Sequence, residues 1–370
     1  MATKKTKVSR RKFLKTGTVA AGAGAAALAM PNVSMAATTT LKVQAAWGGG
    51  IFLENAKSYV DRVNKMAGKG LKIDLLSVNS VVKTSQMQDA VHRGVLDGAH
   101  YVPAYWYSKS PAASLFGTGP CFGWSAQEML GWIHYGGGMG LFNELMKSLG
   151  LNLVSFFNSP MPAQPLGWFK EKISKSSQMK GLKYRTVGLA ADVMNEMGLS
   201  VVQLPGGEIQ PAMKSGLIDA AEFNNPTSDS DFGMQDVSKH YHLASFHQSQ
   251  ECFEVTFNAK KFNALSSELQ AILEYASEAE NSNFYWNNTL RYADDLIKLK
   301  TKHDVNVYRT PDSIMKDQLK AWDVVVNRIS AKDPFFAKVV KSQKAYAKKV
   351  MNYLLLNQPD YGIAYKHHFG

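Results

Sequence analysis

Arg185 is the side chain of this sequence best suited to holding an organic anion. It follows Lys183 and Tyr184 at the expected end of a strand, within the segment GLKYRTVG at residues 181–188. The planar guanidinium can donate two charge-assisted hydrogen bonds to one carboxylate. A surface or structural ion pair is the more common role of such an arginine. The residue type therefore leaves both roles open.

Glu222 is the second residue with chemical potential, and it stands near the end of the apolar segment LIDAAEF at residues 217–223. A carboxylate at the end of a buried strand is costly unless it meets a cation. That cation is either Arg185 or a metal ion. Three aromatic residues at expected strand ends, Trp47, Tyr105 and Trp106, can wall the apolar side of a ligand, although isolated aromatics more often belong to the core.

The remaining chemistry is limited by residue type. Only Cys121 and Cys252 are present, which excludes a disulfide framework, an iron–sulfur cluster and a cysteine-rich zinc site. One disulfide between them is open, and two separate thiols are favoured. The histidines have no metal-ligand spacing, and no Ser-His-Asp or Cys-His arrangement is recognisable.

The elements that must position Arg185 and Glu222 carry an internal repeat. AVHRGVLDGAHY at residues 90–101 returns as AMKSGLIDAAEF at residues 212–223, with a glycine and an aspartate in matching places. Each copy reads as a helix that ends at glycine and turns into a strand. Such units recur in any α/β protein, yet a duplicated one favours two similar lobes. Strand ends of this kind form ligand clefts in open α/β sheets.

The rest of the chain predicts an α/β fold built as two lobes. A βαβαβ opening is expected over 41–101, and a second series of strands and helices begins near Leu151. A strand at 253–258 precedes an uninterrupted helical pattern from 266 to about 302, long enough to brace both lobes. Helices at 311–329 and 334–356 follow. We expect one lobe at 37–160 plus about 250–290, and the other at 161–249 plus about 291–370.

The first 36 residues predict export. Ser9-Arg10-Arg11-Lys12 precedes an apolar run through Met30 and a small-x-small site at 34–36, which is a twin-arginine signal peptide. The mature protein should therefore be periplasmic. Removing this basic segment leaves 35 basic and 30 acidic residues, so the formal net charge falls from +12 to +5. Nucleic acid is not an expected partner, because no basic stripe interleaved with aromatics remains.

Three segments together resemble the DctP-type solute-binding proteins of tripartite ATP-independent periplasmic (TRAP) transporters. They are GLKYRTVG at 181–188, LPGGEIQPAMKSGLIDAAEF at 204–223 and FNAKKFNALSSELQ at 257–270. The pair LPGGEI and GLIDAAE narrows the resemblance to the branch that binds 2-oxo and 2-hydroxy monocarboxylates. The resemblance implies that two lobes close on a small organic acid and deliver it to TRAP membrane permease subunits, without enzymatic chemistry. It also permits a homodimer through the C-terminal helices.

The resemblance implies roles for particular residues. Arg185 would clamp the substrate carboxylate, with Trp47 and Tyr105 on the pocket wall. Glu222, the backbone carbonyl of Phe223, Gln164 and the substrate carboxylate would share a cation. An all-oxygen shell suits Na⁺ or Ca²⁺ and does not suit zinc.

This sequence departs from that pattern at two positions. Phe223 replaces the usual tryptophan, which keeps the backbone ligand and alters the pocket wall. A further family carboxylate falls on Gln248, and the missing charge would weaken a divalent site. Two other functions stay open. One is a periplasmic metal-assisted hydrolase or lyase acting on a carboxylate substrate, for which only Glu222 could serve as base, and the other is a ligand-sensing partner of a membrane receptor.

Overall fold

The structure, a computed structural model, describes residues 38–204 and 206–370. The expected twin-arginine signal at 1–36 lies outside these residues. Residues Thr38–Gly370 form one compact unit. Among the described residues, none of the helices combines the length and the apolar character needed to cross a bilayer.

The first of two sheets has the strand order β2-β1-β3-β10-β4 among the described residues. The first three strands are parallel, and β10 runs antiparallel to β3 and β4. Helices α2 (Gly50–Ala67) and α3 (Met87–His92) connect the parallel strands. The strands span Thr39–Ala45 (β1), Leu71–Leu76 (β2), Gly98–Tyr101 (β3), Leu153–Met161 (β4) and Glu251–Asn258 (β10).

The second sheet has the order β11-β9-β5-β8-β6-β7. Its helices α7 (Leu189–Glu196), α8 (Gly206–Ser215) and α9 (Pro226–Asp231) follow β6, β7 and β8. The strands span Gly167–Phe169 (β5), Lys183–Arg185 (β6), Ser200–Val202 (β7), Ala220–Ala221 (β8), His240–Leu243 (β9) and Asn306–Arg309 (β11). The chain passes between the two sheets after β4, again before β10 and a third time between β10 and β11, so neither lobe is one continuous segment.

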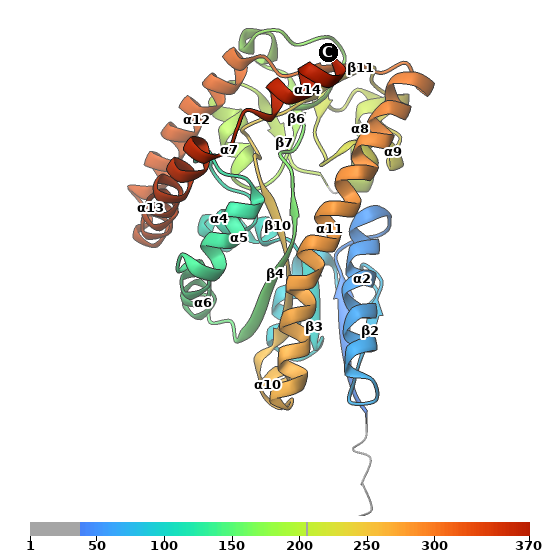
Figure 1. The fold of residues 1–370 in the computed structure, drawn as a ribbon, viewed down its shortest axis with the longest axis vertical. Helices are drawn as coiled ribbons and strands as arrows, with labels where there is room; N and C mark the ends of the chain where they lie inside the picture. Colours follow the sequence, from blue (N-terminus) through green and yellow to red (C-terminus); the bar gives the residue numbers. More distant parts are fainter. Residues whose placement is uncertain (1–37, 205) are drawn as a thin grey trace, which may run out of the picture. The chain divides into compact units, whose positions relative to one another are not determined.

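Helix α11 (Ser267–Lys302) runs beside both lobes, as Figure 1 shows in orange. Its Leu273 and Ala276 join the apolar core of β1, β2 and β10, whereas Leu299 joins the core under β5 and β9. The Ser266 hydroxyl caps the first turn by accepting a hydrogen bond from the Leu269 N–H. The expected long bracing helix is therefore confirmed.

Helices α4, α5, α6, α12 and α13 lie on the side of this frame that is left in Figure 1. Helix α13 packs against α4, α5 and α6, whereas α12 packs against α7. Helix α13 thus contacts helices that follow β3 of the first sheet, whereas α12 contacts a helix that follows β6 of the second. The lobe boundaries given above stay a prediction. The helices span Pro111–Gly117 (α4), Ala126–Tyr135 (α5), Gly138–Ser148 (α6), Ala259–Asn263 (α10), Asp312–Ser330 (α12), Pro334–Asn357 (α13) and Tyr361–Phe369 (α14).

The two repeat copies fold into the same turn. Gly94 and Gly216 both have a φ of +75°, the left-handed conformation that ends a helix and favours glycine. In the first copy, the Asp97 carboxylate accepts from the Lys42 backbone N–H at 2.9 Å. In the second, Asp219 accepts from the Lys183 N–H at 3.0 Å.

The backbone completes this match. The Asp97 N–H donates to the Lys42 carbonyl at 3.0 Å, and the Asp219 N–H donates to the Lys183 carbonyl at 2.8 Å. Asp97 therefore fixes its turn to the neighbouring parallel strand β1, and Asp219 fixes its turn to β6 in the same way. The repeat therefore has a structural role. Glu222, which follows β8, occupies the position in the second copy that His100 occupies in the first.

Candidate functional site

One cavity is lined by side chains from both lobes, at the ends of the strands. Its volume is about 20 Å³, room for little more than one ordered water. Four aromatic side chains and a carboxylate come from the first lobe, and a guanidinium, two amides and an aromatic come from the second. The lining residues include Trp47, Phe52, Tyr105, Glu251 and Phe253 on one side and Gln164, Arg185, Val187, Phe223 and Asn224 on the other.

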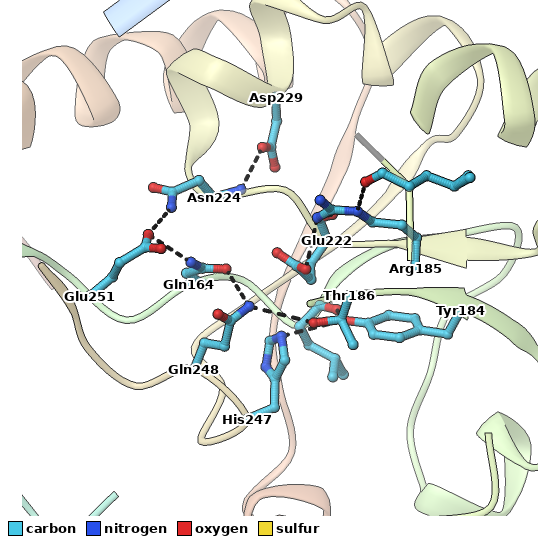
Figure 2. Close-up of polar contacts among 12 residues, drawn as sticks. Gln164, Tyr184, Arg185, Thr186, Glu222, Asn224, Asp229, His247, Gln248 and Glu251 are labelled. Atoms are coloured by element: carbon cyan, nitrogen blue, oxygen red, sulfur yellow. Dashed lines mark hydrogen bonds and ion pairs between the residues drawn. The ribbon is translucent and has the colours of Figure 1, made fainter. Parts of the chain in front are cut away.

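Arg185 is held almost completely buried at the end of β6 (Figure 2). Its Nη1 donates to the Glu222 carboxylate at 3.0 Å and to the Glu222 backbone carbonyl at 3.2 Å, and its Nε donates to the Leu204 carbonyl at 3.0 Å. Its guanidinium carbon lies 5.9 Å from the centre of the Phe223 ring. Within the described chain Nη2 has no protein acceptor. The ion pair thus fixes one end of the guanidinium and leaves the other for a ligand.

The Glu222 carboxylate is fully buried, and only one of its oxygens is neutralised by Arg185. The other oxygen, Oε2, has no hydrogen-bond donor among the described residues. Burial raises the pKa of Glu222 to about 8, because the Arg185 charge and the nearby Thr186 hydroxyl offset only part of the desolvation. Figure 2 shows this carboxylate directed toward Gln164. A buried carboxylate oxygen without a donor is a suitable ligand for a cation.

Gln164 is fixed by a chain of amide contacts (Figure 2). Its backbone N–H donates to the Gln248 carbonyl, and its side-chain Oε1 accepts from Gln248 Nε2, both at 2.9 Å. Its Nε2 donates to Glu251 Oε2 at 2.9 Å, and Asn224 Nδ2 donates to the same oxygen. Burial raises the pKa of Glu251 to about 7. Gln248 carries no charge, and it holds Gln164 in position through these two hydrogen bonds.

The loop after β8 is anchored by a buried carboxylate. Asp229 accepts from the Asn224 backbone N–H at 3.1 Å and from the Trp168 indole N–H at 2.9 Å. Because Trp168 lies in β5, these bonds tie the cavity wall to the second sheet. Burial raises the pKa of Asp229 to about 6.

The aromatic wall comes from the first lobe. Trp47 stacks on Phe253 with 4.5 Å between ring centres, and its indole N–H donates to His100 Nδ1 at 2.8 Å. The Tyr105 ring centre lies 6.0 Å from that of Trp47. Trp106 instead packs edge-on against Tyr101 in the core, so it is not a site residue. His100, read from the sequence as a structural histidine, supports the wall by orienting Trp47.

The predicted site residues are brought together. Trp47, Tyr105, Gln164, Arg185 and Phe223 line the cavity, while Glu222 and Gln248 contact this set directly. Glu251, Asn224 and Phe253 are lining residues that the sequence reasoning missed. Their signal was weak: the expected strand began at residue 253, whereas β10 begins at Glu251. Cys121 and Cys252 are free thiols, and the described residues hold no cluster of three or more His, Cys, Asp or Glu side chains placed to bind a metal.

The available donor set fits a hard cation. Glu222 Oε2, the Gln164 amide oxygen, the Phe223 backbone carbonyl and the Glu251 carboxylate are all oxygens, and one of them lacks a donor. Among the described residues that line the cavity there is no thiolate or imidazole, which disfavours zinc or copper.

Two α/β lobes, a long bracing helix and a cavity lined from both lobes define the two-lobed fold of periplasmic binding proteins. The chain belongs to the bacterial extracellular solute-binding protein family 7, whose sequence model matches residues 50–333. This family membership makes it a solute-binding protein of the TRAP type and not an enzyme, so the hydrolase or lyase interpretation is wrong.

A curated relative is the monocarboxylate 2-oxoacid-binding periplasmic protein of Nostoc sp., which is 29% identical over 90% of this chain and 89% of its own length. The solved structures include TRAP solute-binding proteins with bound pyruvate. That of Pseudoalteromonas atlantica contains sodium, with 27% identity and a TM-score of 0.81 over 90% of this chain and 100% of its own. That of Colwellia psychrerythraea contains calcium, with 28% identity and the same score and coverage.

A TRAP solute-binding protein of Bordetella bronchiseptica has the same architecture at 25% identity and a TM-score of 0.82, over 90% of this chain and 97% of its own. It is a dimer with calcium and picolinate in one active site. In these relatives, a cation accompanies an organic carboxylate in the same fold.

Proposed function

We propose that this protein captures a small 2-oxo or 2-hydroxy monocarboxylate, together with a Ca²⁺ or Na⁺ ion, in the cavity between its lobes. The observation that carries the proposal is the arrangement of Arg185 and Glu222. A guanidinium with one free end lies beside a buried carboxylate oxygen that has no donor among the described residues. The two groups suit the two halves of a cation–carboxylate pair.

Different side chains would bind the ligand carboxylate and the cation. The free end of Arg185 donates charge-assisted hydrogen bonds to the ligand carboxylate, and its other N–H groups keep the plane of the guanidinium fixed. Glu222, Gln164 and the Phe223 carbonyl would hold the cation, and Gln248 keeps Gln164 in position. When bound, the cation supplies positive charge that neutralises Glu222 and attracts the ligand carboxylate.

The cavity also indicates the size of the ligand and a movement of the lobes. A volume of about 20 Å³ leaves no route for an organic acid to enter while the walls stay together. Separation of the lobes would open the site, and closure would bury the ligand against Trp47 and Phe253. The close aromatic wall favours an acid as small as pyruvate over a bulky one.

We place the mature protein in the periplasm after export by the signal at 1–36, where it would deliver its ligand to the permease subunits of a TRAP transporter. The support is the twin-arginine sequence pattern together with the periplasmic relative from Nostoc. The sensing role shares the same ligand site, so only identification of the membrane partner separates it from transport.

We also propose a homodimer formed through the C-terminal helices. The end of α13 and all of α14 are exposed, and the side chains of Leu356, Tyr361, Ile363, Tyr365 and Phe369 are between 65 and 80% accessible. A second copy is the occupant best supported, because the Bordetella relative is a dimer.

The proposed function is tested by thermal unfolding of the mature protein with a panel of 2-oxo, 2-hydroxy, dicarboxylic and aromatic acids. Each acid is measured with Ca²⁺, with Na⁺ and with a chelator. A ligand that binds only the folded state raises the midpoint. The expected result is a rise with a small monocarboxylate that the chelator weakens. No shift with any 2-oxo or 2-hydroxy acid under any cation condition contradicts the substrate class.

A further inference from the structure

A second buried carboxylate, Glu251, lines the cavity beside which Glu222 lies. Glu251 is 5% exposed and opens strand β10 at a bulge, where the pairing with β4 shifts between Glu251 and Phe253. Glu251 and Phe253 are two residues apart on β10 and both line the cavity, whereas Glu254, on the other face of the strand, lies in the core and accepts from Ser155. Glu251 thus reaches the site from the first lobe, opposite Arg185 and Glu222.

Charge balance shows what this second carboxylate does. Arg185 is the cationic side chain that lines the cavity, and it pairs with Glu222. Glu251 accepts hydrogen bonds from two neutral amides, Gln164 and Asn224, and forms no ion pair within the described residues. When a bound cation keeps both carboxyl groups ionised, one guanidinium and two carboxylates leave a net charge of −1. A monocarboxylate ligand would make it −2, which a divalent cation cancels and a monovalent cation does not.

Glu251 also decides which way the Gln164 amide faces. A carboxylate oxygen can only accept, so the Gln164 amide that contacts it must present its nitrogen, at 2.9 Å. The amide oxygen of Gln164 is then directed away from Glu251, toward Gln248 and the side of the cavity on which Glu222 lies (Figure 2). The fully buried Glu222 Oε2, which lacks a donor among the described residues, is directed toward the same amide. The two oxygens thus lie on the same side of the Gln164 amide, one from the loop between β4 and β5 and the other from the residue after β8.

We propose that Glu251 is the second negative charge of the cation site, and that it makes the site selective for a divalent hard cation such as Ca²⁺ over Na⁺. This inference rests on the proposed function and deepens it. The resemblance leads to a carboxylate at position 248, but Gln248 contributes no charge. Glu251, three residues further along the chain, supplies the negative charge instead. Ligand charge count is a main determinant of calcium affinity in proteins.

The test measures cation binding directly, without organic acid. Calcium is titrated by calorimetry into the mature wild-type protein and into Glu251→Gln, which keeps the shape and removes the charge. Terbium luminescence sensitised by Trp47 gives a second readout that does not depend on ligand transport. We expect Glu251→Gln to weaken calcium binding by about 10- to 100-fold, with a much smaller change in the sodium-induced rise of the unfolding midpoint.

Two further variants make the result specific. Glu254→Gln, the same substitution on the same strand with its side chain in the core, should bind calcium as the wild type does. Gln248→Glu in the Glu251→Gln background returns a carboxylate to the other neighbour of Gln164 and should recover most of the lost affinity. If Glu251→Gln fails to fold, wild-type selectivity decides: a midpoint raised equally by Ca²⁺ and Na⁺ overturns the proposal.

Failure of this inference differs from failure of the proposed function. Unchanged calcium affinity in Glu251→Gln, while the wild type still binds a 2-oxo acid, overturns the role of Glu251 alone. A wild-type protein that binds calcium through Glu251 but no organic acid keeps the inference and removes the substrate class.

Discussion

The Arg185 guanidinium and the Glu222 carboxylate form a buried ion pair in which each partner keeps one end free. Nη1 and Oε1 are 3.0 Å apart, while Oε2 has no donor among the described residues. A buried ion pair of this kind adds little stability, because desolvation of both groups opposes their attraction. Its value lies in fixing two groups of opposite charge at the mouth of one cavity.

Substituting Arg185 with lysine should weaken binding of the organic acid while preserving the fold. The ammonium keeps a positive charge beside Glu222 and loses the planar fork, so one or more hydrogen bonds to the ligand carboxylate are lost. Each such bond contributes about 1.5–3 kcal/mol, so the dissociation constant should rise about 10- to 150-fold. Calorimetric titration with pyruvate in calcium measures it. Arg328→Lys, on an exposed pair with Glu196, is the matched control and should bind normally.

Trp47 should report ligand binding by its fluorescence, because it lines the cavity and stacks on Phe253. In Trp47→Phe most of the ligand-induced change in tryptophan emission should disappear, and the affinity should fall about tenfold or less. Trp286→Phe removes an indole that is 72% exposed on α11 and should leave the change intact. If both variants lose the ligand-induced change in tryptophan emission equally, that change does not arise in the cavity.

The buried carboxyl of Glu254 should make stability fall as the pH rises. Burial raises its pKa from 4.5 to about 8 in the folded state. The folded value lies above the unfolded one, so its contribution to the free energy of unfolding is complete below about pH 4.5 and is lost progressively up to about pH 8.

Glu254→Gln removes this titration. The free energy of unfolding of the variant minus that of the wild type should grow by up to about 1.4 kcal/mol for each pH unit within that window. Urea unfolding at a series of pH values measures this difference. A difference that stays constant from pH 5 to pH 8 would mean that the carboxyl titrates normally.

The two repeat aspartates should contribute equally to stability. Asp97→Ala and Asp219→Ala each remove one hydrogen bond to a strand N–H and one ion pair with an exposed lysine, Lys261 or Lys170, which should lower the free energy of unfolding by about 1 kcal/mol. The double variant should lose the sum, because the sites lie in different lobes. Asp61→Ala, at an exposed position of α2, should change it by less than about 0.5 kcal/mol. A large effect in one lobe only would contradict the structural equivalence.

Ending the chain after Gln358 should abolish the proposed dimer and leave ligand binding unchanged. This deletion removes α14, whose side chains are exposed and contribute nothing to the cavity. Light scattering coupled to size exclusion gives the mass of each form. A truncated protein that remains dimeric would move the interface elsewhere, and a monomeric full-length protein would exclude the dimer at that concentration.

The sequence by itself determined the elements and much of the site. Apolar periodicity without a proline or glycine predicted the long helix, which the structure has at Ser267–Lys302. The duplicated glycine and aspartate predicted two equivalent turns, and both have the same φ and the same hydrogen bonds. These features were readable because helix periodicity and turn chemistry depend on residues close together in the chain.

Only the tertiary structure decided which residues surround Gln164. Glu251 is 87 residues away from it in the sequence, and their contact depends on the chain crossing before β10 and on the register in which β10 pairs with β4. A shift of one residue in that register would turn Glu251 away from the cavity, since successive side chains point to opposite faces of a sheet. The short strands β8 and β9 carry too few residues for a periodic signal, so their pairing also came from packing.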